Sequence, residues 1–164
     1  MKTLRDLLVH QVKDLHSGET QIIDAMPELI NAARDDDLVK ALEDHLEQTR
    51  MHRSRLEEIA EKLDGEPGGV TCKGMKGIIE EGRTVIGDEA EEDDVQDAAI
   101  ITAAQRIEHY EMAGYGSART YARMLAEHEI ANTLQEILDQ EQNADEHLTR
   151  IAEGHVNRRA MATS

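Results

Sequence analysis

The chain has 164 residues, which suits one domain with a sizeable core, and its formal net charge is −17. This negative charge excludes binding to DNA or RNA through phosphates and binding to anionic membrane surfaces, because both need basic patches. With one cysteine and no Phe or Trp, the chain forms no intrachain disulfide, and its core must consist of aliphatic side chains that favour close-packed helices.

The distribution of apolar and charged residues indicates a cytoplasmic protein. No stretch reaches the apolar length of a membrane span, and charges interrupt the N-terminal segment, unlike a secretory signal. The acidity fits a cation-handling protein, an ordinary solvated surface or a high-salt source.

The first predicted helix covers residues 4–33. Thr3 and Asp6 resemble a capping box, and Pro27 should kink or split the helix. Glu19 is the acidic residue on its apolar stripe, where it is either a solvated edge residue or a ligand. The stripe is Leu8, Val12, Leu15, Glu19, Ile22, Met26, Leu29 and Ala33.

A turn at Asp35–Asp37 precedes the second predicted helix, which ends before the DGEPGG segment at 64–69. Two histidines and a threonine stand in the middle of its stripe, flanked by Glu47 and Gln48. Each histidine is either a hydrogen-bonded core residue or a ligand. The stripe is Leu38, Leu42, His45, Thr49, His52, Leu56, Ile59 and Leu63.

A connection at residues 70–92 follows, with a modest helical pattern of its own. A short loop would make its flanking helices antiparallel neighbours. A connection of this length can carry the chain along the whole bundle as one long crossover with a short extra helix.

The third predicted helix covers residues 94–126 and carries two glutamates, Glu108 and Glu111, on its apolar stripe. A buried, unpaired carboxylate costs several kcal/mol, so the core is wet, the carboxylates share protons, or a cation lies between them. The stripe is Ile101, Ala104, Glu108, Glu111, Tyr115, Ala118, Ala122 and Leu125.

The fourth predicted helix covers residues 130–155 and again has acidic residues, Glu141 and Asp145, in mid-stripe. We expect residues 1–160 to form a single domain and residues 161–164 to be a frayed tail.

The polar residues of all four stripes are predicted to lie in one layer. Antiparallel helices have the same rise per residue, so residues equally far from a shared turn lie at equal height. Counted from turns near residues 35 and 128, Glu19 is level with the Thr49–His52 segment, and Glu108 and Glu111 are level with Asp145.

Carboxylates and imidazole that converge from several helices suit divalent transition metals. A ferritin-like site takes one Glu from each of two helices and a Glu-x-x-His pair from each of the other two. Here the corresponding pairs read Thr49-x-x-His52 and Glu141-x-x-Ala144. We predict Glu19, His52, Glu108, Glu111, Glu141 and Asp145 as ligands, with His45, Glu47 and Gln48 as supporting or alternate ligands.

The chain resembles the YciF-like family of ferritin-like, rubrerythrin-related stress proteins over nearly its full length. The resemblance is carried by DLHSGETQI at 14–22, HLEQTRMHRSRLE at 45–57, CKGMKGIIEEG at 72–82, AAQRIEHYEMAGYG at 103–116 and LDQEQNADEHLTRIA at 138–152. It implies an all-α, ferritin-like four-helix bundle, a homodimer and a di-metal centre.

The chain departs from the family pattern near the predicted layer. His16 stands where the family has Tyr, Gln48 and Gln140 stand where it usually has acidic residues, and Arg50 stands where some members have His. These changes leave open a two-metal site, a one-metal site, a weak site or none.

Three functions follow as hypotheses, one of which is a simple metal-binding module without turnover; the other two are more specific. The first is a di-iron carboxylate protein of the stress response, with manganese or zinc as alternatives to iron, that oxidises Fe(II) or reduces peroxide. The second is a non-enzymatic helical stress protein with a vestigial site, which acts through dimerisation or a partner. Enzymatic activity is therefore left open.

Overall fold

The computed structural model describes residues 1–63, 65–87 and 93–162, and these residues contain helices and no strand. The all-α prediction is therefore confirmed. The elements are α1 (Leu4–Ala32), α2 (Asp36–Leu63), α3 (Lys73–Gly87), α4 (Asp93–Met124), α5 (His128–Ile151), a π-helical turn (Ala152–Val156) and α6 (Asn157–Ala162).

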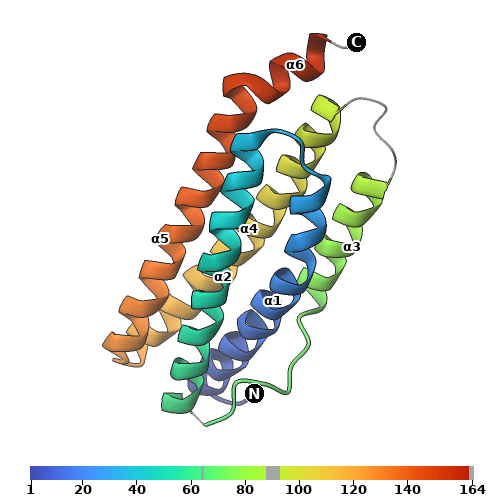
Figure 1. Ribbon diagram of the computed structural model, residues 1–164. Coiled ribbons are helices and arrows are strands. Elements are labelled where there is room, and N and C mark those ends of the chain that lie inside the picture. Colours follow the sequence, from blue (N-terminus) through green and yellow to red (C-terminus); the bar gives the residue numbers. More distant parts are fainter. Residues whose placement is uncertain (64, 88–92, 163–164) are drawn as a thin grey trace.

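The four long helices form a bundle of two hairpins, α1 with α2 and α4 with α5 (Figure 1). Helix α1 also packs on α4, and α2 packs on α5, so each long helix has two long neighbours. After α2 the chain runs back along the bundle, and α3 packs on the outside of α1 and α4. The long crossover with a short extra helix is confirmed.

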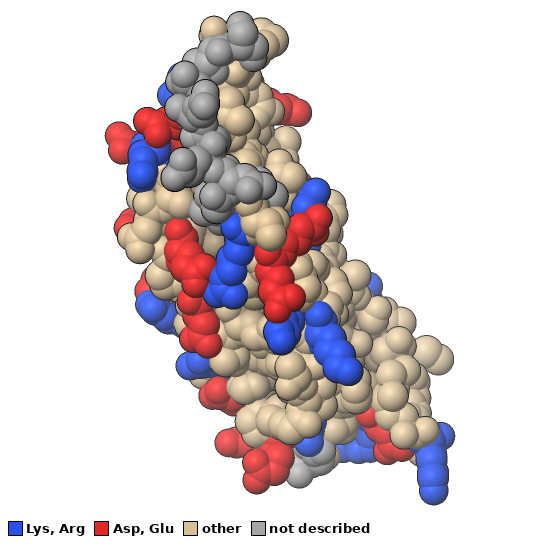
Figure 2. All heavy atoms as spheres, turned by 90° about the vertical axis from the view of Figure 1, so that its right-hand side faces the viewer, with Lys and Arg blue, Asp and Glu red and all other residues tan. Residues whose placement is uncertain are grey.

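Ion pairs attach α3 to the bundle. Figure 2 shows basic and acidic side chains interspersed on the face that carries α3. Arg83 donates two hydrogen bonds to Glu28 of α1, and Arg106 of α4 lies 3.0 Å from Glu81 of α3. Such exposed pairs contribute little stability each, so the main contribution comes from the apolar contacts below them.

The ends of α1 differ in part from the sequence prediction. The capping box is confirmed, because Thr3 accepts from the Asp6 N–H and Asp6 accepts from the Thr3 N–H. The predicted split at Pro27 is wrong, since α1 continues through this exposed proline to Ala32. Buried Met26 and Leu29 hold the helix on both sides and offset the cost of a proline inside it, about 3 kcal/mol.

The second hairpin also differs at its ends. Helix α4 ends at Met124, and Ala126 adopts a positive φ of 59° in the turn before α5. Helix α5 begins at His128, two residues before the predicted start. It gives way to the π-helical turn and then to α6, which includes Met161 and Ala162 of the predicted tail. Residues 163–164 lie outside the described part of the chain.

Two apolar clusters fill the bundle, one on each side of a polar layer. One contains Ile22, Leu46, Ile107 and Leu148, and the other contains Leu15, Leu56, Tyr115 and Leu138. Along their helices, members of the two clusters flank the buried polar residues Glu19, His52, Glu108, Glu111 and Glu141, and His45 directly precedes Leu46 of the first cluster. The bundle therefore isolates the polar layer from solvent along its axis. Within the described helices, no segment combines the length and apolar character that crossing a membrane requires.

Candidate metal centre

Six side chains from all four long helices meet in the buried polar layer. Each is at most 6% exposed, although each could ionise. Their positions follow from helical spacing, which places each of them on the inward face of its helix. They are Glu19 of α1, His45 and His52 of α2, Glu108 and Glu111 of α4, and Glu141 of α5.

Glu19, His52 and Glu141 form the first donor group. Nδ1 of His52 lies 2.7 Å from Oε1 of Glu141 and 3.6 Å from Oε1 of Glu19. One donor atom from each residue lies within 4.8 Å of the others, which is close enough for all three to bind one ion.

His45, Glu108, Glu111 and Glu141 form the second donor group by the same criterion. Nε2 of His45 lies 3.1 Å from Oε1 of Glu108 and 3.8 Å from Oε2 of Glu141. Glu141 therefore belongs to both groups: Oε1 approaches the histidine of the first group and Oε2 approaches the histidine of the second. This is the arrangement of a carboxylate that bridges two ions.

Most of the oxygen and nitrogen atoms that could bind a metal in this layer have no hydrogen-bond partner. Both oxygens of Glu111 and of Glu141 are buried and unpartnered, and so is Nδ1 of His52 despite its short distance to Glu141. The short nitrogen–oxygen contact lacks the alignment of a hydrogen bond. Unpartnered buried carboxylates are costly, and a metal ion would satisfy them. The residues present therefore fit a metal centre.

Burial raises the pKa values of all four glutamates. The pKa of Glu19 rises to about 7 through burial and the nearby Glu141 charge, against the opposing effects of His52 and Tyr115. Burial likewise raises the pKa values of Glu108 and Glu141 to about 7 and that of Glu111 well above its ordinary value. Without a cation, the layer favours protonated carboxyl groups.

The pKa of His52 rises to about 8. Burial lowers it, but the close carboxylate of Glu141, the charge of Glu19 and the contact with Gln140 together outweigh burial. In the metal-free protein, a protonated His52 thus neutralises part of the negative charge. Four ionised glutamates carry four negative charges, which match the four positive charges of two divalent ions.

Three further contacts orient the donor side chains. The hydroxyl of Tyr115 donates to Oε1 of Glu19, and the amide oxygen of Gln140 lies 2.7 Å from Nε2 of His52. Thr49 donates to the backbone carbonyl of His45 and so provides no ligand. Sequence reasoning did not assign Tyr115 a role in the site, although it lies on the apolar stripe one turn after Glu111. It named Gln140 only as a position where the family usually has an acidic residue.

Three of the predicted site residues lie outside both donor groups. The Asp145 side chain is 18% exposed, accepts a hydrogen bond from Gln105 and lies 3.3 Å from Nε2 of His109. Glu47 is exposed and pairs with Arg50. Gln48 is half-buried and faces a cleft. In contrast, His45, predicted as a supporting residue, provides an imidazole to the second group.

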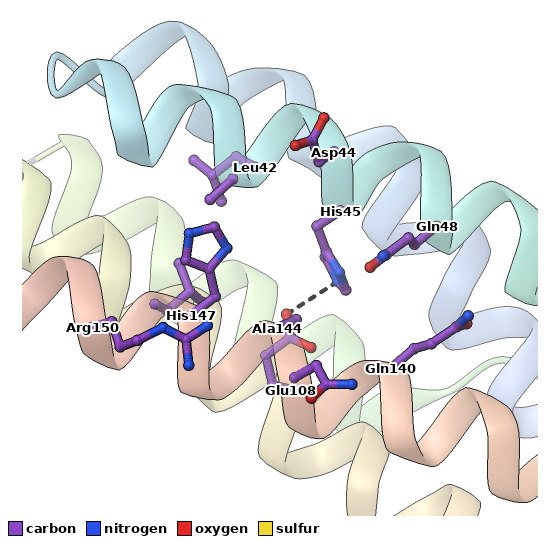
Figure 3. Close-up of a pocket in the computed structure, with 12 residues that line it drawn as sticks. Leu42, Asp44, His45, Gln48, Glu108, Gln140, Ala144, His147 and Arg150 are labelled. Carbon is purple, nitrogen blue, oxygen red and sulfur yellow. Dashed lines mark ion pairs between the residues drawn. The ribbon is translucent and has the colours of Figure 1, made fainter.

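A cleft of about 390 Å³ between α2 and α5 leads to the second donor group (Figure 3). His45 extends from α2 toward Glu108, and the dashed line in the figure marks their ion pair. Gln48 faces the cleft from α2, and Gln140 and Ala144 face it from α5.

Comparisons with known proteins agree with this architecture. The family model described as "Domain of unknown function (DUF892)" matches residues 3–161. Protein YciF of Escherichia coli (strain K12) is 37% identical over 161 residues, which cover 98% of this chain and 96% of YciF.

Solved structures show the same fold. The crystal structure of the E. coli stress protein YciF superposes with a TM-score of 0.90 at 37% identity, covering 96% of this chain and 99% of that one. YcfI, a putative structural protein from Rhodopseudomonas palustris, gives a TM-score of 0.87 at 37% identity, covering 91% and 94%.

A more distant structure identifies the fold class. The ferritin-like, diiron-carboxylate protein from Bacillus anthracis str. Ames gives a TM-score of 0.71 at 18% identity, covering 92% of this chain and 99% of that one. At this identity the likeness concerns the fold alone, which is ferritin-like. The near-complete family match and the 37% identity to YciF show that this chain belongs to the YciF-like family, DUF892.

Proposed function

We propose that this protein is a di-iron carboxylate protein of the stress response that oxidises Fe(II) or reduces peroxide. The observation that carries the proposal is the position of Glu141 between two donor groups, with one oxygen toward each histidine. Two iron ions bound there would supply redox chemistry and a coordination position for an oxidant. The donor set of carboxylates and imidazoles also suits manganese or zinc.

The chain's own residues have separate roles in this proposal. Glu19 and His52 would hold one ion, His45, Glu108 and Glu111 would hold the other, and Glu141 would contribute to both donor groups. Tyr115 and Gln140 hold Glu19 and His52 in place through hydrogen bonds. The apolar clusters on both sides exclude water from the layer along the bundle axis.

Metal analysis tests the proposal. Protein purified after growth with added iron should contain about two ions per chain, the number that the two donor groups accommodate. Anaerobic protein loaded with Fe(II) should develop a new absorbance when oxygen or peroxide is added. Protein that holds no iron after supplementation, and shows no oxidant-dependent change, would contradict the proposal.

The alternative is a non-enzymatic stress protein with a weak site. Thr49 and Ala144 favour it, because each stands where a Glu-x-x-His pair would provide a ligand. Such a protein would act through dimerisation or partner binding. It would bind iron weakly and show no oxidant-dependent absorbance, which the same experiment detects.

We further propose a cytoplasmic homodimer that binds neither nucleic acid nor membranes. The family resemblance supports the dimer, the net charge of −17 supports the lack of nucleic-acid and membrane binding, and the charged N-terminal segment supports the location.

A further inference from the structure

The cleft between α2 and α5 reaches only one half of the candidate metal centre. His45 and Glu108 line it, and both belong to the second donor group. Glu19 and His52 are fully buried and are not among the described residues that line the cleft. The two halves of the centre therefore differ in access to solvent, although they share Glu141.

Ala144 accounts for this difference. It lies three residues after Glu141 on the same helix and forms part of the cleft wall (Figure 3). A side chain at this position would point to the same side of α5 as Glu141, because residues three apart are neighbours on a helix surface. The methyl group of Ala144 leaves that volume empty. With alanine at position 144, α5 lacks the histidine of a Glu-x-x-His pair, and the cleft stays open.

At the inner end of the cleft, the side chains are potential metal ligands rather than cationic groups. Both ring nitrogens of His45 and Oε2 of Glu108 lack hydrogen-bond partners, and these side chains are 6% and 1% exposed. Farther out, the lining adds the amides of Gln48, Gln140 and Asn143, together with the Asp44 carboxylate, the His147 imidazole and the Arg150 guanidinium. Imidazole, carboxylate and amide oxygen are ligands for a divalent cation.

We propose that the half of the centre at His45 and Glu108 is an exchangeable divalent-cation position that fills and empties through the α2–α5 cleft. The half at Glu19 and His52 retains its ion, because both residues are fully buried and neither is among the described residues that line the cleft. This inference rests on the proposed di-metal function and adds that the two ions are unequal. In the proposed oxidation of Fe(II), the exchangeable ion would be the one that enters as substrate.

Co(II) release tests this inference without any catalytic assay. Co(II) loaded anaerobically absorbs visible light when bound by imidazole and carboxylate, so a chelator in excess should release it in two phases, one fast and one slow. Ala144→His restores an imidazole beside Glu141 and should slow the fast phase by about tenfold or more, leaving the slow phase unchanged. Ala113→His, on the exposed face of α4, is the matched control and should release Co(II) like the parent.

Ala144→His both fills the cleft and adds a ligand. Ala144→Phe fills the cleft without adding a ligand and so distinguishes the two effects. It should slow both loading and release of the fast ion by about tenfold or more, without changing the number of ions bound. A parent that binds two ions and releases them in a single phase would overturn the inference, as would unchanged rates in Ala144→Phe. Neither result would affect the proposed function. A parent that binds neither Co(II) nor Fe(II) would overturn both.

Discussion

The amide oxygen of Gln140 lies 2.7 Å from Nε2 of His52, on the far side of the imidazole from Nδ1 and Glu141. An amide oxygen can only accept, so Nε2 carries the hydrogen. Once His52 is neutral, the lone pair of Nδ1 points toward the carboxylates, which is the state that binds a metal.

Replacing Gln140 by Leu should therefore weaken metal binding. Loss of the residue that orients a ligating histidine costs about 10- to 100-fold in affinity. Competition against a chelator of known affinity measures the change. Gln140→Glu keeps an acceptor at Nε2 and should stay much closer to the parent. Equal affinities of Gln140→Leu and the parent would show that Gln140 does not orient His52.

Tyr115→Phe should destabilise the metal-free protein. The hydroxyl of Tyr115 donates to Glu19, and its loss leaves a buried carboxyl oxygen without a partner. The expected cost is about 1–3 kcal/mol in the free energy of unfolding, measured by urea denaturation. Tyr121→Phe, which removes a hydroxyl from a partly buried side chain packed against the same apolar cluster as Tyr115, is the control. Equal losses in both variants would contradict a specific role for Tyr115.

The sequence predicted the polar layer well because charged residues interrupt otherwise apolar stripes. A charged residue on a buried face of a helix has few possible roles, and the rise per residue of the helices places these residues at one height. Glu19, Glu108, Glu111, Glu141 and His52 all lie in this layer.

The details of the layer depend on how each helix is rotated about its axis and on the lengths of the side chains. The spacing of apolar residues along a helix specifies neither. Asp145 lies four residues after Glu141, yet its carboxylate turns toward Gln105 at the edge of α4. His45 and His52 are about 10 Å apart along the helix axis, too far to bind one ion. Both belong to the layer because Glu141 presents one oxygen to each. The cleft at Ala144 depends on side-chain volumes across two helices and was beyond prediction.

The metal-free protein should lose stability as the pH rises from about 4.5 to about 8. The folded-state pKa values of Glu19, Glu108 and Glu141 are raised to about 7, so their contribution is complete below the ordinary value and is lost as pH rises through about 7. The raised pKa of His52, about 8, acts in the same direction at higher pH.

Thermal denaturation across this pH range measures the effect. Saturating Fe(II) or Mn(II) should raise the melting temperature and flatten its fall with pH, because bound cations stabilise the ionised carboxylates and displace protons. A melting temperature that rises with pH in the metal-free protein, or equal values with and without metal, would contradict this prediction.

Light scattering should report a mass close to two chains. The dimer prediction depends on the family resemblance, and the long crossover leaves α3 on an outer face of the bundle. Both the metal-free and the metal-loaded protein should be measured. Because the candidate centre lies within one chain, metal binding should not change the mass. A particle of 24 subunits or a monomer in both states would contradict the prediction.

Glu111 offers the most discriminating test of the centre, because it is a predicted ligand while its buried, unpartnered carboxyl group destabilises the metal-free fold. Both of its oxygens are buried and unpartnered, and burial together with the charges of Glu19 and Glu141 raises its pKa well above the ordinary value. Glu111→Ala should abolish high-affinity binding, a loss of more than about 100-fold, since even residues behind the ligands cost 10- to 100-fold.

The bundle should nevertheless stay folded, because Glu111→Ala also removes a buried carboxyl group that has no hydrogen-bond partner. Glu111→Gln keeps the volume and should match or exceed the parent in free energy of unfolding near neutral pH. His52→Ala should weaken binding less than Glu111→Ala, since Glu19 and Glu141 remain in the first donor group. Metal titration with circular dichroism on the same samples separates binding from folding. If Glu111→Ala stays folded and binds iron as tightly as the parent, the polar layer is not the metal site.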